Sequence, residues 1–141
     1  MKMRRCRECG EGTVRKVSQA GRFASFKTMQ QLEIPEDFEI PTCERCGAEW
    51  LDAKTAQALD KVLAVAYRAE LSRRAQESIA KIAQRRPQCR LEKLLGLSQG
   101  YLSKLKSGDR AASPELVAQL ALVARNPEKR IRELEEFWGA R

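Results

Sequence analysis

Apolar and polar positions follow two different patterns before and after residue 52. Residues 13–17 alternate between polar and apolar side chains, as a half-buried strand does, and residues 23–29 continue with β-favouring side chains. Pro35 and Pro41 bracket a loop that leads into another short strand. The first 52 residues therefore predict a small β module.

Helical spacing begins after Asp52, a suitable N-cap, and no Gly or Pro interrupts residues 53–86. Apolar residues recur three and four positions apart in the first part of this segment and again from Ile79. The stretch between them, residues 68–77, is nearly all polar or small and predicts a hinge or a break between domains. Pro87 ends the helix because the residue before a proline is disfavoured in the α region.

The rest of the chain predicts four short helices with sharp joints. Gly96 closes the first of them and Ser98 is the predicted N-cap of the second. Ser113 and Asn126 each precede a proline, which places an N-cap before a proline at the first helical position. The predicted helices cover residues 89–95, 99–106, 114–124 and 127–138.

Two Cys-x-x-Cys knuckles, Cys6/Cys9 and Cys43/Cys46, are separated by 33 residues in a chain without histidine. A glycine follows each knuckle, and its left-handed backbone directs amide N–H groups back at the sulfurs. Two such turns supply four thiolates, which is the closed tetrahedral shell of structural zinc. The sequence therefore predicts one structural Zn²⁺ that holds a small module together and catalyses nothing.

A disulfide framework is the alternative for these cysteines, and the odd count of five weakens it. The N-terminus lacks the apolar run of a signal peptide, and no segment has the unbroken apolar length of a membrane span. These features predict a cytoplasmic protein without a membrane partner, in which thiols stay reduced and bind metal.

The net charge of +8 is concentrated in the centre of the chain. Residues 1–60 hold ten basic and ten acidic side chains, residues 61–110 hold twelve and four, and residues 111–141 hold five of each. Such asymmetry predicts two regions with different partners, one of them a polyanion. An RNA-binding zinc ribbon is less favoured because residues 1–60 carry no net positive charge.

The basic centre contains a helix-turn-helix pattern around Gly96, which would make the turn. Leu91 and Leu95 would face the core, and Leu102 and Leu105 would anchor the second helix. A helix held in this way can enter the major groove of DNA with its first side chains on base edges. A helical hairpin with solvated lysines is the alternative, but the one region of excess positive charge is also the one that carries the turn.

Gln99 is suited to pair with adenine and Lys104 with guanine, whereas Ser103 can contact a base or a phosphate. Flanking arginines and lysines would contact phosphates and add affinity without sequence information. The predicted DNA-contacting residues are Arg85, Arg86, Arg90, Ser98, Gln99, Gly100, Tyr101, Ser103, Lys104, Lys106 and Arg110.

This pattern continues through Lys106-Ser107-Gly108-Asp109-Arg110 and Ser113-Pro114-Glu115-Leu116, and it resembles the Xre/lambda-repressor family of five-helix DNA-binding domains. The resemblance implies that Gln88, at the start of the first helix of the motif, contacts a phosphate. Glu92 departs from the family, which usually has a small residue there, and is expected to tilt outward.

The order of both modules resembles MqsA-type antitoxins, through the paired knuckles, the run Gly47-Ala48-Glu49-Trp50-Leu51-Asp52 and the closing Asn126-Pro127-Glu128. The resemblance implies an antitoxin whose zinc module binds a small ribonuclease toxin. Its paired C-terminal domains would repress their own operon by binding a palindromic operator, so that the bacterial protein joins the nucleoid when DNA-bound. An Xre-family regulator without a toxin is the alternative.

The expected architecture is therefore α+β with two domains. A zinc-ribbon-like domain with four cysteine ligands covers residues 1–52, a helical connector residues 53–76, and an all-α, lambda-repressor-like helix-turn-helix domain residues 77–141. The last helix carries an apolar stripe that serves either the core or a two-fold homodimer contact, as palindromic half-sites require. The dimer candidates are Ile131, Leu134, Phe137 and Trp138.

Two features of the sequence allow two interpretations each, and a third argues against an enzyme. Phe23 and Phe26 belong either to the core or to a surface for a protein partner. Cys89 is either an inert, partly buried thiol or, beside Arg86 and Arg90, a redox-sensitive one. No enzyme is expected, because histidine is absent and there is no Gly-rich phosphate loop.

Overall fold

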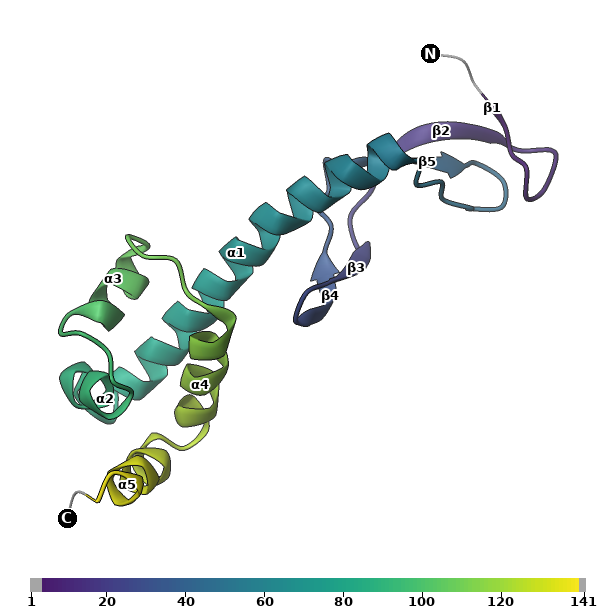
Figure 1. The fold of residues 1–141 in the computed structure, drawn as a ribbon. Coiled ribbons are helices and arrows are strands. Elements are labelled where there is room, and N and C mark those ends of the chain that lie inside the picture. The colour runs from purple at the N-terminus through teal and green to yellow at the C-terminus, as the bar shows by residue number, and fades with distance from the viewer. Residues whose placement is uncertain (1–3, 140–141) are drawn as a thin grey trace. The chain divides into compact units, whose positions relative to one another are not determined.

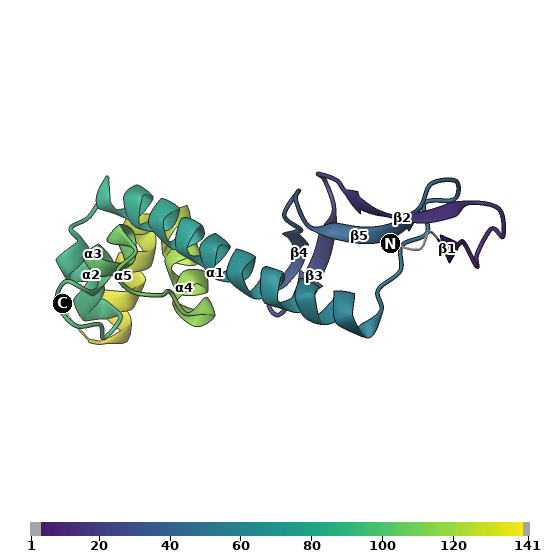
Figure 2. The ribbon, with the colours of Figure 1, turned by 90° about the horizontal axis from the view of Figure 1, so that it is seen from above.

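The computed structural model describes residues 4–139, which form five strands followed by five helices (Figures 1 and 2). The chain divides into two compact units, Met1–Tyr67 and Arg68–Arg141. A small β module with a cysteine cluster, followed by helices, confirms the predicted α+β class in two parts. The domain bounds proposed from the sequence stay predictions. The elements are β1 Arg4–Arg5, β2 Thr13–Ser18, β3 Phe23–Phe26, β4 Met29–Glu33, β5 Glu39–Cys43, α1 Ala53–Ala83, α2 Gln88–Leu94, α3 Tyr101–Ser107, α4 Pro114–Arg125 and α5 Pro127–Phe137.

The first sheet has three antiparallel strands in the order β1-β2-β5. In the middle strand, Thr13 pairs with Arg5 of β1 and Val14 pairs with Cys43 of β5. Pro41 lies in β5, an edge strand of this sheet, where proline is tolerated. The pairing brings the knuckle after β1 and the knuckle at the end of β5 to the same end of the sheet.

The second sheet is the hairpin β3–β4, which lies beside the first half of α1 (Figures 1 and 2). The ring of Phe26 meets Tyr67 of α1 edge-on at 5.5 Å between centroids, and Thr28 Oγ1 lies 2.6 Å from the Tyr67 hydroxyl. The sequence predicted residues 23–29 as one stretch, whereas the chain turns after Phe26 at Lys27, whose φ is +48°. Phe26 therefore packs on the helix, and Phe23 is exposed.

Arg22 is buried in the loop between β2 and β3 and donates to three backbone carbonyls. Its Nε donates to Gln19 O at 3.2 Å, its Nη1 to Val17 O at 3.4 Å, and its Nη2 to Phe38 O. These bonds join the end of β2 to the segment that leads into β5. The guanidinium thus connects the two ends of the segment between β2 and β5 that contains the β3–β4 hairpin.

Helix α1 begins where the sequence predicts, because Asp52 Oδ1 accepts a hydrogen bond from Thr55 N at 2.7 Å. The helix is not broken in residues 68–77, since it is continuous from Ala53 to Ala83. The boundary between the two compact units nevertheless falls between Tyr67 and Arg68, at the start of the stretch predicted as a hinge or a break between domains. Leu71 and Ala75 are buried and continue the apolar stripe at four-residue spacing, so the stretch is less polar on its inner face than its composition indicates.

The helical unit has a core of leucines from three helices, all nearly inaccessible: Leu91 of α2, Leu102 and Leu105 of α3, and Leu120 of α4. The predicted caps of α4 and α5 are confirmed. Ser113 Oγ accepts from Leu116 N, and Asn126 Oδ1 accepts from Lys129 N, both at 3.3 Å. No helix among residues 4–139 is both long and apolar enough to cross a membrane.

The predicted start of α3 is wrong. Ser98 precedes the helix by three residues and its backbone carbonyl accepts from Tyr101 N at 3.1 Å, while Gly100 with φ +81° is the N-cap. A glycine N-cap has no side chain that could accept from the first N–H groups of the helix. Their acceptor is a side chain from elsewhere in the unit, described below.

Candidate metal centre and helix-turn-helix surface

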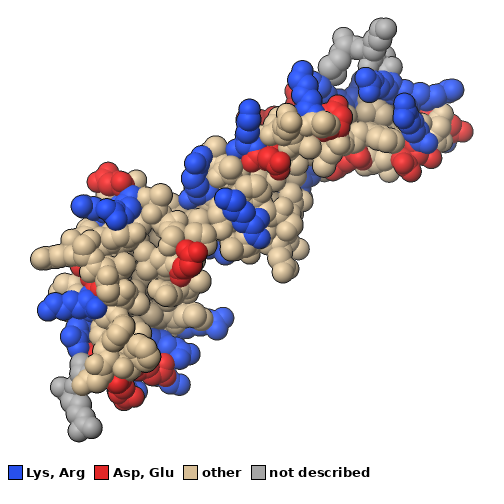
Figure 3. All heavy atoms as spheres, viewed as in Figure 1, with Lys and Arg blue, Asp and Glu red and all other residues tan. Residues whose placement is uncertain are grey.

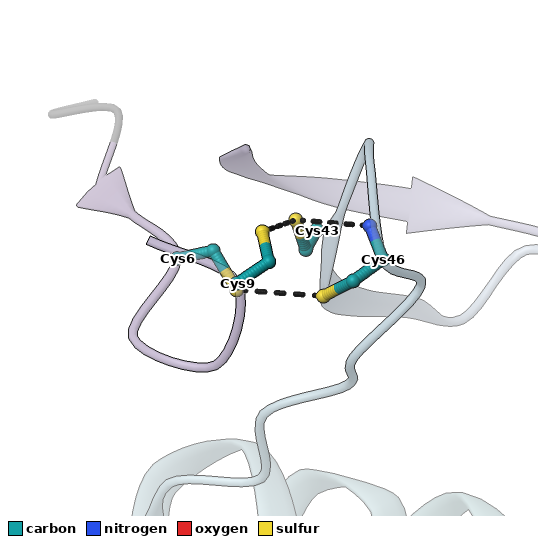
Figure 4. Close-up of side chains that lie close together, drawn as sticks. All are labelled: Cys6, Cys9, Cys43 and Cys46. Carbon is teal, nitrogen blue, oxygen red and sulfur yellow. Dashed lines mark hydrogen bonds between the residues drawn. The ribbon is translucent and has the colours of Figure 1, made fainter. Parts of the chain in front are cut away.

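The two knuckles bring four sulfurs together at one end of the sheet (Figure 4). The Sγ atoms of Cys6, Cys9, Cys43 and Cys46 all lie within 4.8 Å of one another. Cys6 Sγ is 3.6 Å from Cys46 Sγ, and Cys9 Sγ is 3.7 Å from Cys43 Sγ. All of the cysteines are free, so the disulfide alternative is not what the structure contains.

These separations fit a metal ion at the centre of the cluster. Four Zn–S bonds of about 2.3 Å in tetrahedral geometry place the sulfurs about 3.8 Å apart. Two distances between the knuckles, 3.6 and 3.7 Å, agree with that edge length. The prediction that the four cysteines can hold a metal ion is therefore supported by their geometry.

Backbone N–H groups surround the sulfurs, as expected from the two knuckle glycines. Gly10 and Gly47 have φ of +72° and +74°, the left-handed conformation that the sequence predicts. Gly12 N donates to Cys9 Sγ at 3.3 Å, and Arg45 N donates to Cys43 Sγ at 3.4 Å. These donors favour the thiolate over the thiol and so favour metal binding.

The pKa values of the cluster thiols show that the four sulfurs do not all ionise easily side by side. The Gly12 N–H is the main cause that lowers the pKa of Cys9 to about 7, and the N–H of Cys46 is the main cause that lowers the pKa of Cys43. The Ala48 N–H favours the Cys46 thiolate, but lost hydration and the three neighbouring sulfurs raise the pKa of Cys46 to about 12. Four adjacent thiolates repel one another, and a divalent cation removes that repulsion.

Glu92 contradicts the expectation that it tilts outward. Its carboxylate is directed into the helical unit, where the residue is only 5% exposed. Glu92 Oε1 accepts from Gly100 N at 3.2 Å, and Oε2 accepts from Leu102 N at 2.9 Å. A carboxylate at a helix N-terminus satisfies free N–H groups and complements the helix dipole. Glu92 therefore replaces the missing cap and fixes α3 against α2.

The predicted DNA-contacting residues mostly face solvent. Ser103, Lys104 and Lys106 are exposed on α3, opposite the buried Leu102 and Leu105. Ser98 and Gln99 are exposed in the turn that precedes the helix, and Gly100 is half-buried. Arg85, Arg86 and Arg110 are exposed as well, and Gln88 and Arg90 are half-buried.

Three contacts hold predicted DNA-contacting residues in place. Arg110 stacks on the Tyr101 ring at 4.5 Å from its centroid, so Tyr101 positions a cation beside α3 and its own ring is partly covered. Ser103 Oγ donates to Gln88 Oε1 at 3.4 Å, which joins the exposed ends of α2 and α3. Arg90 Nε lies 3.3 Å from Glu135 Oε1 of α5. This ion pair partly neutralises the Arg90 charge, so Arg90 attracts a phosphate less strongly.

The dimer candidates separate into two groups. Ile131 is 2% exposed and belongs to the core of the helical unit, and Leu134 is half-buried. Phe137 and Trp138 are 74% and 63% exposed and their rings meet edge-on at 4.8 Å. Trp138 Nε1 donates to Leu94 O at 2.8 Å, so the exposed pair is fixed on the surface. Phe137 and Trp138 are therefore the dimer candidates most exposed to a second copy.

Cys89 is exposed on α2, not partly buried as one of its two interpretations supposed. The structure also reveals a group of basic residues that the sequence did not single out. Arg4, Arg5 and Arg7 line a cavity in the N-terminal unit together with Trp50. They were missed because acidic residues cancel their charges when charge is counted along the sequence. The basic residues come together only when β1 pairs with β2 in the folded unit.

Comparison with protein-family models and with curated proteins found no match for this sequence. Any assignment of function therefore rests on the residues and the geometry described above.

Proposed function

We propose that this protein is a DNA-binding transcriptional regulator in which one zinc ion holds the N-terminal module together. The observation that carries the proposal is the exposed face of α3. Ser103, Lys104 and Lys106 face outward from a helix that Leu102 and Leu105 anchor in the core. A rigidly packed helix with exposed polar and cationic side chains has what is needed to read base edges in the major groove.

Cations around α3 support the same proposal. Arg110 is positioned by Tyr101 next to the helix, and Arg85 and Arg86 are exposed before α2. Such groups contact phosphates and supply the part of the affinity that depends on salt. The fixed, exposed pair Phe137 and Trp138 is a suitable contact for the homodimer that a palindromic operator requires.

The test uses a duplex from upstream of the protein's own reading frame and a scrambled duplex of equal length and composition. The proposal predicts binding to the upstream duplex at least about 1,000-fold tighter, as for specific regulators. Equal affinity for the two duplexes at near-physiological salt, measured by fluorescence anisotropy, would contradict it.

We further propose that the regulator is an antitoxin whose zinc module binds a small ribonuclease toxin. This part rests on the resemblance to MqsA-type antitoxins in the order and spacing of the two modules. Its test is co-expression with the product of a small neighbouring reading frame, followed by an RNA-cleavage assay. A stable complex that suppresses cleavage supports the antitoxin, whereas no complex leaves an Xre-type regulator without a toxin.

A further inference from the structure

A cavity of about 660 Å³ opens in the N-terminal unit beside the three-stranded sheet and the linker that leads into α1. Val14, Pro41 and Trp50 give it an apolar surface. Its rim is basic on the side of β1 and β2. The basic residues that line it are Arg4, Arg5, Arg7, Arg15 and Lys16.

Strand pairing creates this concentration of charge. Arg4 lies opposite Val14 and Arg5 lies opposite Thr13, so the basic residues of β1 come next to those that follow in β2. Figure 3 shows Lys and Arg gathered along one edge of the β part, whereas Asp and Glu lie mainly along the other. The equal numbers of basic and acidic residues in the first 60 positions therefore conceal a strongly cationic surface.

Most of these cations have no ion-pair partner among residues 4–139. Arg15 pairs with Glu44 at 2.7 Å, but no ion pair between described residues involves Arg4, Arg5 or Lys16. Asp52 also lines the cavity, and its carboxylate is already bonded to the backbone of α1. Like charges grouped in this way repel one another, and an anionic ligand relieves the repulsion.

Trp50 adds an aromatic ring to the cationic rim. Its backbone N–H donates to Pro41 O at 2.9 Å, which fixes the residue through the main chain. Its indole N–H is buried without an acceptor among residues 4–139, so no hydrogen bond explains the position of the ring. An aromatic ring that lines the same cavity as several arginines offers a stacking surface for a planar group.

We propose that this cavity binds a single-stranded segment of nucleic acid, with the arginines on its phosphates and an unpaired base on Trp50. Basic grooves with interleaved aromatic rings bind single strands in this way. A duplex fits less well because its bases are already stacked and paired and cannot stack on Trp50. An acidic peptide could pair with the arginines but has no base to stack on the ring. The proposal is independent of the function assigned to α3.

The experiment uses the full-length protein and a fluorescein-labelled oligouridylate of about eight nucleotides, within the span that such modules cover. The variant Arg5→Glu/Lys16→Glu reverses two charges of the rim, and Trp50→Leu removes the ring. Lys61→Glu is the matched control, because Lys61 is exposed in the same unit and does not line the cavity. Metal content and circular dichroism establish that each variant is folded.

The double variant should bind roughly tenfold more weakly or worse, since each lost phosphate contact lowers affinity. Trp50→Leu should bind about fivefold more weakly or worse, given the strength of base stacking, and Lys61→Glu should bind like the unaltered protein. In a Trp138→Phe background, which leaves Trp50 as the remaining indole, the oligomer should quench tryptophan fluorescence.

Four outcomes overturn the proposal. The first is no binding by the unaltered protein at low salt, and the second is equal binding by the double variant. The third is equal binding and equal quenching by a duplex, or by an acidic peptide of the same charge, which would assign the cavity to that partner instead. The fourth is loss of oligomer binding through Lys104→Ala to the same extent as through the rim variant, which would place the oligomer on the helical unit.

Discussion

At the scale of single residues, Gly12 determines whether the two knuckles can approach each other. A Cβ atom at this position would lie 2.2 Å from Cys43 Sγ and 2.9 Å from Arg45 Cβ. Its backbone N–H also donates to Cys9 Sγ. Gly12 is therefore needed for a close approach of backbone to the metal ligands, and not for a special φ angle, since it is absent from the positive-φ glycines among the described residues.

Gly12→Ala should weaken zinc binding roughly 10- to 100-fold, as expected for a change in the groups that support metal ligands. A competition titration with a chromogenic chelator measures this affinity. Gly21→Ala is the matched control, because Gly21 has φ +81° and open space around its Cα. The control should lose about 1 kcal/mol of stability and keep its zinc affinity. Equal zinc affinity in both variants would be evidence against the cluster as described.

Glu92→Ala should destabilise the helical unit by about 1–3 kcal/mol, because one buried and one partly buried N–H group lose their acceptor. Glu92→Gln keeps a side-chain oxygen and should be less severe. Glu136→Ala, an exposed glutamate outside the ion pairs of the described residues, should be close to neutral. Urea unfolding followed at 222 nm measures all three, and an unchanged midpoint for Glu92→Ala would disprove the capping role.

With the exception of the Ser98 cap, the residue-level predictions succeeded where the signal is local and failed where it is not. The Cys-x-x-Cys spacing and the caps Asp52, Ser113 and Asn126 depend on neighbours within four positions, so the sequence displays them. Glu92 acts on residues eight and ten positions later. Gly12 acts on the other knuckle, so neither role is visible without the fold.

At the scale of elements, helix α1 crosses the boundary between the two units without interruption. Glu70 lies just after that boundary, where Arg73 and Arg74 each approach it within 3 Å. The hydrogen bond from Arg73 is the main cause that lowers the pKa of Glu70 to about 2. Ion pairs at this spacing support a helical stretch whose outer face is fully polar.

This lowered pKa predicts the pH dependence of a Glu70→Gln variant. Because the folded-state pKa lies below the unfolded one, the ionised carboxylate stabilises the protein above the unfolded pKa of about 4.3. That contribution is lost as pH falls towards 2. Glu70→Gln should therefore cost about 0.5–1 kcal/mol near neutral pH, since its partners are half-exposed, and the difference should vanish towards pH 2.

Thermal unfolding across this pH range measures the difference between the variant and the unaltered protein. Asp60→Asn is the control, as Asp60 is exposed on the same helix and outside the ion pairs of the described residues. A pH-independent difference for Glu70→Gln, or an equal one for Asp60→Asn, would contradict the assignment.

Most elements could be predicted from the sequence, and the errors have physical causes. Leu71 and Ala75 are buried on the inner face of α1 in a stretch that is polar by composition, which is why the helix runs unbroken through it. The boundary between the two units still falls at the start of that stretch. The turn at Lys27 carries no Gly or Pro signal, so the hairpin β3–β4 was missed. The start of α3 was misplaced because Ser98 has the composition of a cap but not its geometry.

At the scale of the whole molecule, the metal is expected to stabilise one unit and not the other. The four ligands all belong to Met1–Tyr67, and the leucine core of the helical unit contains none of them. Binding free energy of a structural metal is folding free energy for the small module that it closes. The second unit has its own core, so we expect its folding not to depend on that contribution.

Cys43→Ser should abolish bound zinc and unfold the N-terminal unit, while the helices of Arg68–Arg141 persist. Elemental analysis and circular dichroism measure the two effects. Cys89→Ser is the control, because Cys89 is free and lies outside the cluster. Retained zinc and an unchanged spectrum in Cys43→Ser would refute the metal site, and loss of all helical signal would refute the independence of the second unit.

Whether the exposed face of α3 reads DNA is tested by comparing Lys104→Ala with Lys93→Ala. Both lysines are exposed in the helix-turn-helix, but Lys93 lies on α2 and outside the predicted contact set. Affinities for the upstream and scrambled duplexes are measured at one salt concentration. We expect Lys104→Ala to lose about 1–3 kcal/mol of discrimination and Lys93→Ala to keep it. Unchanged discrimination in Lys104→Ala, or equal loss in both variants, would contradict this role of α3.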